Sequence, residues 1–160
     1  VLFYSRSDYS RGAMFRMTKK TGYGLIATVY LARRGTDSPV SAKDIAETFG
    51  LSQPLIMNVL KKLSSAGCVK SVRGGRGGYK LANKPEKISL EKIITALEGS
   101  VHLTRCSSAK IGKDKQSCNL FQRCPIIKSI SRLEKQFNDL LRKTTLSEFA
   151  KGICPPGKDF

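Results

Sequence analysis

The stretch SAKDIAETFGLSQPLIMNVLKKLSSAGCVKSVRGGRGGYKLA, residues 41–82, decides the fold. Its first part predicts two short helices, because Ser41 and Ser52 are good N-cap residues and Gly50 and Gly67 stand where a helix should end. Two capped helices joined by a tight turn are typical of a helix-turn-helix, whose second helix reads the major groove of DNA. An ordinary helical hairpin has the same pattern, so the residues that follow decide between the two.

Those residues predict a β-hairpin. Val69 and Val72 lead into a glycine-rich turn, and Tyr79 and Leu81 lead out of it. The glycines let the backbone turn sharply and approach a phosphate chain. Because a helix-turn-helix followed at once by a basic hairpin is typical of a winged helix, we expect a mostly α-helical fold with a small β-hairpin wing.

The charge of the chain indicates a polyanionic partner. Lys and Arg number 29 against 12 Asp and Glu, which gives a formal net charge of +17. Such an excess favours nucleic acid over an anionic membrane or a merely solubilising surface. The predicted DNA-contacting residues are Ser52, Gln53, Met57, Asn58, Lys61 and Lys62 on the second helix and Arg73 and Arg76 at the hairpin tip. We expect double-stranded DNA as the partner, with the tip arginines reaching a minor groove.

Further helices are predicted on both sides of this stretch. Thr18 can cap a first helix that runs to about Arg34. Its expected apolar face consists of Leu25, Ile26, Val29 and Tyr30. A helix ending at Gly99 follows the hairpin, with Leu90, Ile93, Ile94 and Leu97 at helical spacing. A long helix begins at Pro125, and Thr145 with Glu148 caps a short closing helix.

The long helix carries apolar residues at alternating steps of four and three. These are Ile126, Ile130, Leu133, Phe137 and Leu140. That spacing is a heptad seam, which packs either within the domain or against a second chain. We expect a long dimerisation helix, and a homodimer that binds a palindromic operator. The expected boundaries are a leader over 1–13, the winged helix-turn-helix over 14–99, a cysteine-bearing loop over 100–124, the dimerisation and closing helices over 125–150 and a tail over 151–160.

Five cysteines occur in the chain: Cys68, Cys106, Cys118, Cys124 and Cys154. An odd number without a secretion signal argues against a disulfide framework and predicts a cytoplasmic protein. Cys106, Cys118 and Cys124 lie between two predicted helices, and their thiolates suit an iron–sulfur cluster or zinc. On spacing alone, inert or redox-active thiols stay open as well. His102 and Cys154 are the candidates for a fourth ligand, and Cys68 is expected to be a small buried residue.

Several segments together resemble one family, the Rrf-type bacterial transcriptional regulators, which includes IscR and NsrR. The resemblance rests on MFRMTKKTGYG, on the helix-turn-helix, on VKSVRGGRGGYKLA, on ISLEKIITALEGSVHLTRC and on TLSEFA, and it runs from Met14 to about Gly152. The branch that regulates SUF iron–sulfur assembly looks nearest. The resemblance implies a dimer whose long helix crosses its mate. It also implies a 2Fe–2S or, less favoured, a 4Fe–4S cluster held by Cys106, Cys118 and Cys124.

The chain departs from the family at the fourth ligand. Some relatives use an acidic residue just before the tyrosine that matches Tyr23, and this chain has Gly22 there. Others use a histidine three residues after the last cysteine, where this chain has Ile127. The first gap between cysteines is also longer than is common in the family. The resemblance therefore implies a cluster-sensing repressor of iron–sulfur assembly or stress genes, with a cluster-free, thiol- or zinc-responsive regulator as the alternative.

Two other classes of protein are weighed against a regulator. An enzyme has little support, because the chain contains no Cys-x-x-Cys, no Walker loop and no nucleophile–base pair, and because GGRGG leads into a strand and not into a helix. A nucleoid-type protein that binds DNA by charge alone would not distinguish a promoter from random DNA. No apolar run approaches the roughly 20 residues of a membrane span. We expect no catalytic site, no small-molecule substrate and no membrane partner.

Overall fold

The computed structural model describes residues 17–35, 38–75, 77–103 and 123–151. These residues belong to two compact units. One unit contains residues 17–101 together with the chain from 137 onward, and the other contains residues 102–136. The candidate DNA-binding residues lie in the first unit, and His102 and Cys124 lie in the second.

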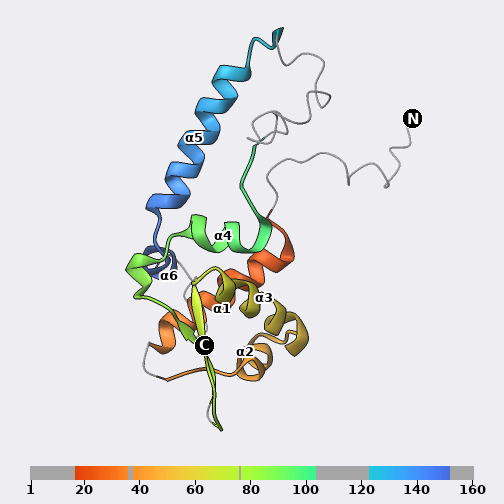
Figure 1. Ribbon diagram of the computed structural model, residues 1–160, viewed down its shortest axis with the longest axis vertical. Coiled ribbons are helices and arrows are strands. Elements are labelled where there is room, and N and C mark those ends of the chain that lie inside the picture. The colour runs from red at the N-terminus through yellow and green to blue at the C-terminus, as the bar shows by residue number, and fades with distance from the viewer. Residues whose placement is uncertain (1–16, 36–37, 76, 104–122, 152–160) are drawn as a thin grey trace, which may run out of the picture. The chain divides into compact units, whose positions relative to one another are not determined.

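The first unit is a helical cluster with one hairpin. Its helices are α1 (Lys19–Arg34), α2 (Ala42–Phe49), α3 (Gln53–Ser65), the 3-10 turn η2 (Pro85–Lys87), α4 (Leu90–Glu98) and α6 (Leu146–Lys151), together with the end of α5 (Ile127–Lys143). Helix α1 packs against α3, α4 and α6, and α3 also packs against α2 and α4 (Figure 1). The largest fully buried apolar side chains are Leu31, Ile45, Ile56, Leu60, Leu63, Ile88, Ile93, Ile94 and Leu146.

The predicted helix-turn-helix is confirmed as α2 and α3. Ser41 and Asp44 form a capping box: the Ser41 hydroxyl accepts from the Asp44 amide at 3.0 Å, and the Asp44 carboxylate accepts from the Ser41 amide at 3.3 Å. Helix α2 ends at Gly50, whose φ of 61° is left-handed, and the Leu51 amide donates to the Ala46 carbonyl at 2.8 Å. This turn lets α3 begin three residues after Gly50.

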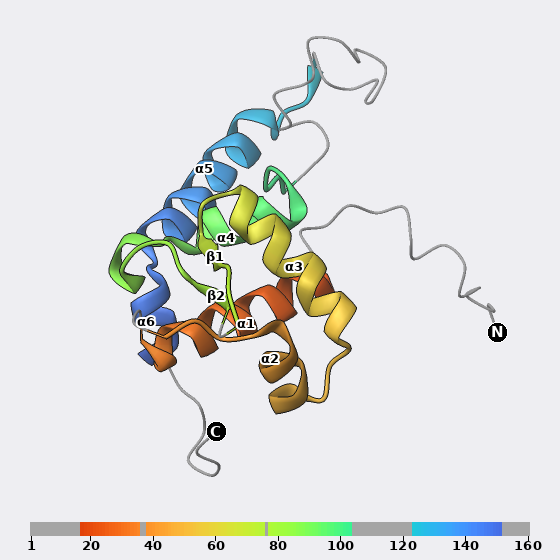
Figure 2. The ribbon, with the colours of Figure 1, turned by 60° about the horizontal axis from the view of Figure 1, so that its bottom comes forward.

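The predicted wing is an antiparallel pair of strands, β1 (Val69–Val72) and β2 (Gly78–Leu81). The hairpin extends beyond α2 at the lower edge of Figure 1, and Figure 2 shows its base beside α1 and α3. Val40, just before α2, exchanges two backbone hydrogen bonds with Tyr79, of 2.9 and 2.8 Å. The base of the wing is thereby fixed to the chain that enters the helix-turn-helix, and the fold is a winged helix-turn-helix.

Two expectations about helices need correction. Ile26 is 37% exposed, and the buried apolar residues of α1 are Leu25, Ala27, Tyr30 and Leu31. Helices α3, α4 and α6 and strand β2 pack against α1, and these contacts, which the sequence pattern does not show, decide which of its apolar residues are buried. Helix α5 begins at Ile127 and not at Pro125, because Pro125 and Ile126 form the turn that precedes it. Over the described ranges, no helix is long and apolar enough to cross a bilayer.

Candidate nucleic-acid interface

Helix α3 separates a buried face from an exposed one. Ile56, Val59, Leu60 and Leu63 are at most 1% exposed and hold the helix against α1, α2 and α4. The six residues predicted to contact DNA all lie on the exposed surface of the same helix and its N-cap: Ser52, Gln53, Met57, Asn58, Lys61 and Lys62. A helix anchored on one side and polar on the other can enter a major groove without disturbing the core. Their contacts with DNA remain predictions.

Ser52 is an N-cap residue with an unusual property. It has the extended backbone of a cap, but its hydroxyl makes no capping hydrogen bond. Pro54, in the first turn of α3, has no amide to donate to that hydroxyl. The expected cap is therefore present in backbone conformation only, and the Ser52 side chain is exposed at the start of the helix.

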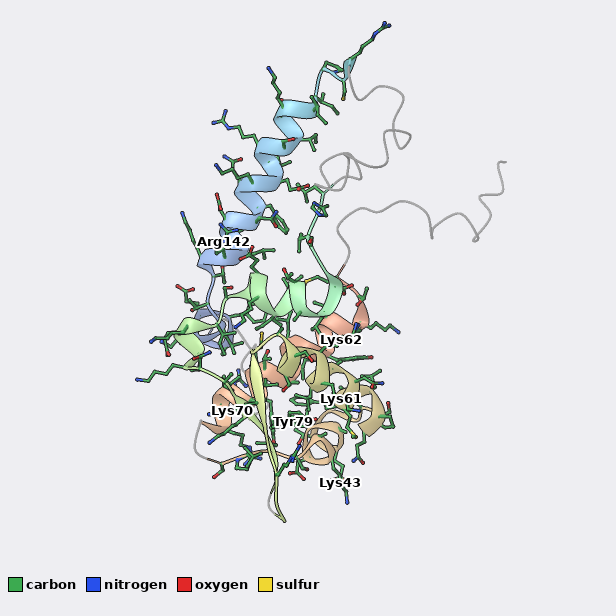
Figure 3. All side chains as sticks on the ribbon, viewed as in Figure 1. Lys43, Lys61, Lys62, Lys70, Tyr79 and Arg142 are labelled. Carbon is green, nitrogen blue, oxygen red and sulfur yellow. The ribbon has the colours of Figure 1, made fainter. Side chains whose placement is uncertain are left out.

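Basic side chains gather around the C-terminal half of α3. An open depression is lined by Lys20, Leu55, Asn58, Val59, Lys61 and Lys62, and another by Lys61, Lys62, Ser65, Ala66 and Ala96. Figure 3 shows Lys61 and Lys62 on α3, and Lys70 and Tyr79 on the hairpin. Lys20 was not predicted from the sequence. It lies on α1, 42 positions before Lys62, and no spacing rule connects two helices that distant in sequence.

The wing presents further positive charge. Arg73 is exposed at the end of β1, where the hairpin begins to turn. Arg76, the other tip arginine predicted to contact DNA, lies outside the described residues. The wing therefore carries at least Lys70 and Arg73 as exposed cations, and its first strand packs against α3.

Of the proposed metal ligands, the structure describes Cys124 and His102. Cys106, Cys118 and Cys154 lie outside the described residues, and Cys124 is half-buried. His102 is also half-buried. Its Nδ1 lies 3.0 Å from the Oε1 of Glu134, and Glu134 is only 8% exposed. The part of the chain that the structure describes brings together no group of three His, Cys, Asp or Glu residues that would hold a metal ion.

The contacts of His102 have a chemical consequence. A carboxylate only accepts hydrogen bonds, so a neutral His102 donates from Nδ1 and keeps the lone pair of Nε2. The same Glu134 carboxylate accepts from the Leu103 amide at 2.8 Å, which fixes the backbone beside the ring. A carboxylate that holds one ring nitrogen while the other is free is the usual arrangement around a histidine that binds a metal.

Cys68 is more deeply buried than Cys124. It is completely buried between α3 and β1, and this burial raises the pKa of its thiol, with only partial opposition from the charge of Lys92. The thiol therefore stays protonated and unreactive at neutral pH. The expectation of a small buried residue is confirmed.

The predicted dimer seam is partly exposed. Ile126, Leu133 and Leu140 are 58%, 52% and 60% exposed, and Ile130 and Phe137 are half-buried. Leu133 and Leu140 lie on α5, and Ile126 just precedes it. Large apolar side chains exposed at heptad spacing along one helix are the pattern expected of a surface that contacts a partner.

Comparisons with known proteins agree with this geometry. The family model described as Rrf2, iron-dependent transcriptional regulator, matches residues 17–152. The HTH-type transcriptional regulator NsrR of Bacillus licheniformis is 28% identical over 133 residues, which are 83% of this chain and 90% of that protein. The HTH-type transcriptional regulator IscR of Erwinia tasmaniensis is 32% identical over 133 residues, which are 83% of this chain and 77% of that protein.

Solved structures show the same likeness. CymR, the global cysteine regulator of B. subtilis, superposes with a TM-score of 0.67 and 29% identity, over 88% of this chain and all of that one. The IscR of T. potens superposes with a TM-score of 0.62 and 34% identity, over 85% of this chain and 86% of that one. These relatives are regulators and not enzymes. The chain therefore belongs to the Rrf2 family and is a DNA-binding transcriptional regulator.

Proposed function

We propose that this regulator is a cytoplasmic homodimer that senses an iron–sulfur cluster and represses genes of iron–sulfur assembly or stress, as the SUF-regulator branch of its family would. One observation carries the proposal. Three cysteines, Cys106, Cys118 and Cys124, fall between α4 and α5 in a chain that matches a family described as iron-dependent.

The donor set fits such a group. Cys106, Cys118 and Cys124 supply three soft thiolates, and His102 offers Nε2 because Glu134 occupies its other nitrogen. Cys154 is the other candidate for the fourth position. A 2Fe–2S cluster is favoured over a 4Fe–4S cluster. Such a cluster would link these residues by iron–ligand bonds that a signal could break. Arg123 and Lys128, which flank Cys124, would offset the negative charge of thiolate ligands.

The proposed DNA contacts divide by role. Gln53, Met57 and Asn58 face outward from α3 and are proposed to read base edges in the major groove. Ser52, Lys61 and Lys62 are proposed to bind phosphates, and Arg73 and Arg76 to reach the minor groove. Two copies joined along α5 would present two reading helices to a palindromic operator, with half-sites about one helical turn or a multiple apart.

An anaerobic preparation tests the cluster directly. Wild-type protein should absorb visible light and contain iron and acid-labile sulfide in equal amounts. Replacing Cys106, Cys118 or Cys124 by Ala should abolish the absorbance, and Cys68→Ala should retain it because Cys68 is buried away from any ligand role. A Cys118→Ala variant with a full complement of iron and sulfide would contradict the ligand assignment. Operator binding by the loaded and the apo protein then shows whether the cluster controls repression.

One observation favours a second candidate, a cluster-free, thiol- or zinc-responsive regulator. The solved structures similar to this chain include CymR of B. subtilis and an oxidized form of CymR from Staphylococcus aureus, the latter with a TM-score of 0.65 and 29% identity. Under this alternative, anaerobic protein would be colourless, and either zinc or mild oxidation would change its affinity for the operator. The iron and sulfide measurement therefore separates the two candidates.

A further inference from the structure

Lys20 and Lys62 form a pair of like charges at one edge of α3. Lys20 is on the first turn of α1 and Lys62 near the end of α3, and both line the depression that Asn58 and Lys61 also border. The pKa of Lys20 lies below its ordinary value, first because of the neighbouring Lys62 side chain and then because Lys20 is partly buried. Two neighbouring cations repel each other, and an anion bound between them offsets that repulsion.

The position of Lys20 is set by the end of α4. The Lys20 ammonium donates to the Leu97 carbonyl at 3.2 Å. The neighbouring Glu98 carboxylate accepts from the Thr18 amide at 3.1 Å and from the hydroxyls of Thr18 and Thr21. These contacts fix the first turn of α1 against the last turn of α4. Lys20 is thus a preorganised cation, and its long side chain loses little further freedom when it binds an anion.

Among the residues that the structure describes, Glu98 offsets the repulsion between Lys20 and Lys62 only in part. Glu98 raises the pKa of Lys20 only in part, since the net direction of the shift is downward. Glu98 is the nearby acid that acts on Lys20, and its carboxylate is shared with the Thr18 and Thr21 hydroxyls. The depression itself is lined by three lysines and one asparagine as its polar residues. Its chemistry therefore suits an oxyanion with several acceptor oxygens.

We propose that Lys20 and Lys62 together bind one backbone phosphate of the operator DNA, so that the start of α1 is a second anchor beside the recognition helix. The proposal rests on the placement of α3 in the major groove. A phosphate contact outside the reading residues fixes the angle of α3 on the duplex and carries no sequence information itself. Lys20 donates to the last turn of α4, and α4 is the helix that precedes the cysteine-bearing loop in the chain.

The chain offers a matched control for the test. Lys19 is exposed on the same turn of α1 and does not line the depression, so Lys19→Gln removes the same charge without removing the contact. We expect Lys20→Gln to lower the slope of log affinity against log salt by about one relative to Lys19→Gln. The ratio of operator to random-DNA affinity should stay unchanged, because phosphates do not differ between sequences. Lys20→Arg should keep the wild-type slope.

Lys61→Gln separates failure of this inference from failure of the proposed reading surface. If Lys61→Gln weakens binding while Lys20→Gln behaves like Lys19→Gln, the α1 anchor is wrong and the α3 interface stands. If none of the three variants changes the salt dependence of DNA binding, the proposed DNA-binding surface on α3 is wrong as well. Thermal unfolding of each variant shows that a loss of binding is not a loss of folding.

NMR of the wild-type protein gives a second readout that needs no variant. The Nζ signal of Lys20 should shift on addition of operator, and the Nζ signal of Lys19 should not. An unchanged Lys20 signal in the presence of bound DNA overturns the proposal. Inorganic phosphate at matched ionic strength distinguishes the sources of the anion. If the site binds DNA phosphate, the Lys20 Nζ signal shifts with operator and shifts little with free phosphate. An equal shift of that signal with free phosphate would overturn the assignment to DNA.

Discussion

The attachment of the wing to the helix-turn-helix makes Gly78→Ala an informative change. A Cβ atom at Gly78 would lie 2.4 Å from the carbonyl oxygen of Val40 and 2.6 Å from its carbonyl carbon. Both are backbone atoms, so the clash cannot be relieved by rotating a side chain. The strand must move away from Val40, and the two hydrogen bonds between Val40 and Tyr79 are then lost or lengthened.

The expected loss of unfolding free energy in Gly78→Ala follows from those two hydrogen bonds. Each backbone hydrogen bond contributes about 0.5–1.5 kcal/mol net, so their loss costs ~1–3 kcal/mol of unfolding free energy. Alanine also has fewer backbone conformations than glycine in the unfolded chain, and this difference raises the free energy of unfolding by about 0.4–1 kcal/mol. The expected net loss is about 1–2 kcal/mol, or roughly 2–8 °C in Tm for a chain of this size.

Gly75→Ala is the matched control. A Cβ atom at Gly75 meets nothing within 4 Å, and Gly75 does not have a left-handed backbone. Its stability should stay within about 0.5 kcal/mol of wild type. Calorimetry or circular dichroism gives Tm for both variants, and operator binding gives the effect on the wing. Equal Tm values for the two variants would refute the reasoning, and equal affinities would show that the bridge to Val40 does not position the wing on DNA.

Three further predictions follow from individual side chains. Leu133→Asp places a charge on an exposed apolar position of α5 and should give a monomer in sedimentation; a variant that stays dimeric would remove Leu133 from the seam. Asn58→Ala should change the preferred base at one operator position in a binding-site selection, and an unchanged preference would exclude Asn58 from base readout. Burial by itself raises the pKa of Glu98, but the hydrogen bonds from Thr18 and Thr21 outweigh it and hold that pKa below 4.5. The stabilisation from Glu98 is therefore present above pH 4.5 and lost as the pH falls through the lowered pKa, so denaturant titrations should show a weaker acid dependence for Glu98→Gln than for wild type.

Local signals in the sequence were sufficient for most of the fold. The caps at Thr18 and Ser41 and the turn at Gly50 are each formed within four residues of chain, so residue type and spacing determine them. The apolar face of α4 was also predicted correctly, because a single buried face follows helical periodicity. The buried residues of α1 were not predicted correctly, because they depend on which helices pack around α1.

The parts of the site that could not be predicted come from contacts between distant segments. The approach of Lys20 to Lys62 requires α1 and α3 to cross, and the contact of His102 with Glu134 joins residues 32 positions apart. Neither pair has a spacing that helical periodicity would reveal. A lysine at the start of a helix and a glutamate on a heptad helix are ordinary surface residues in sequence, and only the fold gives them partners.

Complete burial of Cys68 has a practical consequence for studying the dynamics of this regulator. Its sulfur lies where α3 meets β1, and its backbone carbonyl accepts from the Ala82 amide at 3.0 Å, so a reagent reaches the thiol only when this junction opens. In a variant whose other cysteines are replaced by Ala, the rate of alkylation of Cys68 would report the free energy of that opening. Measured with and without operator, the alkylation rate would show how strongly bound DNA stabilises the junction between the reading helix and the wing.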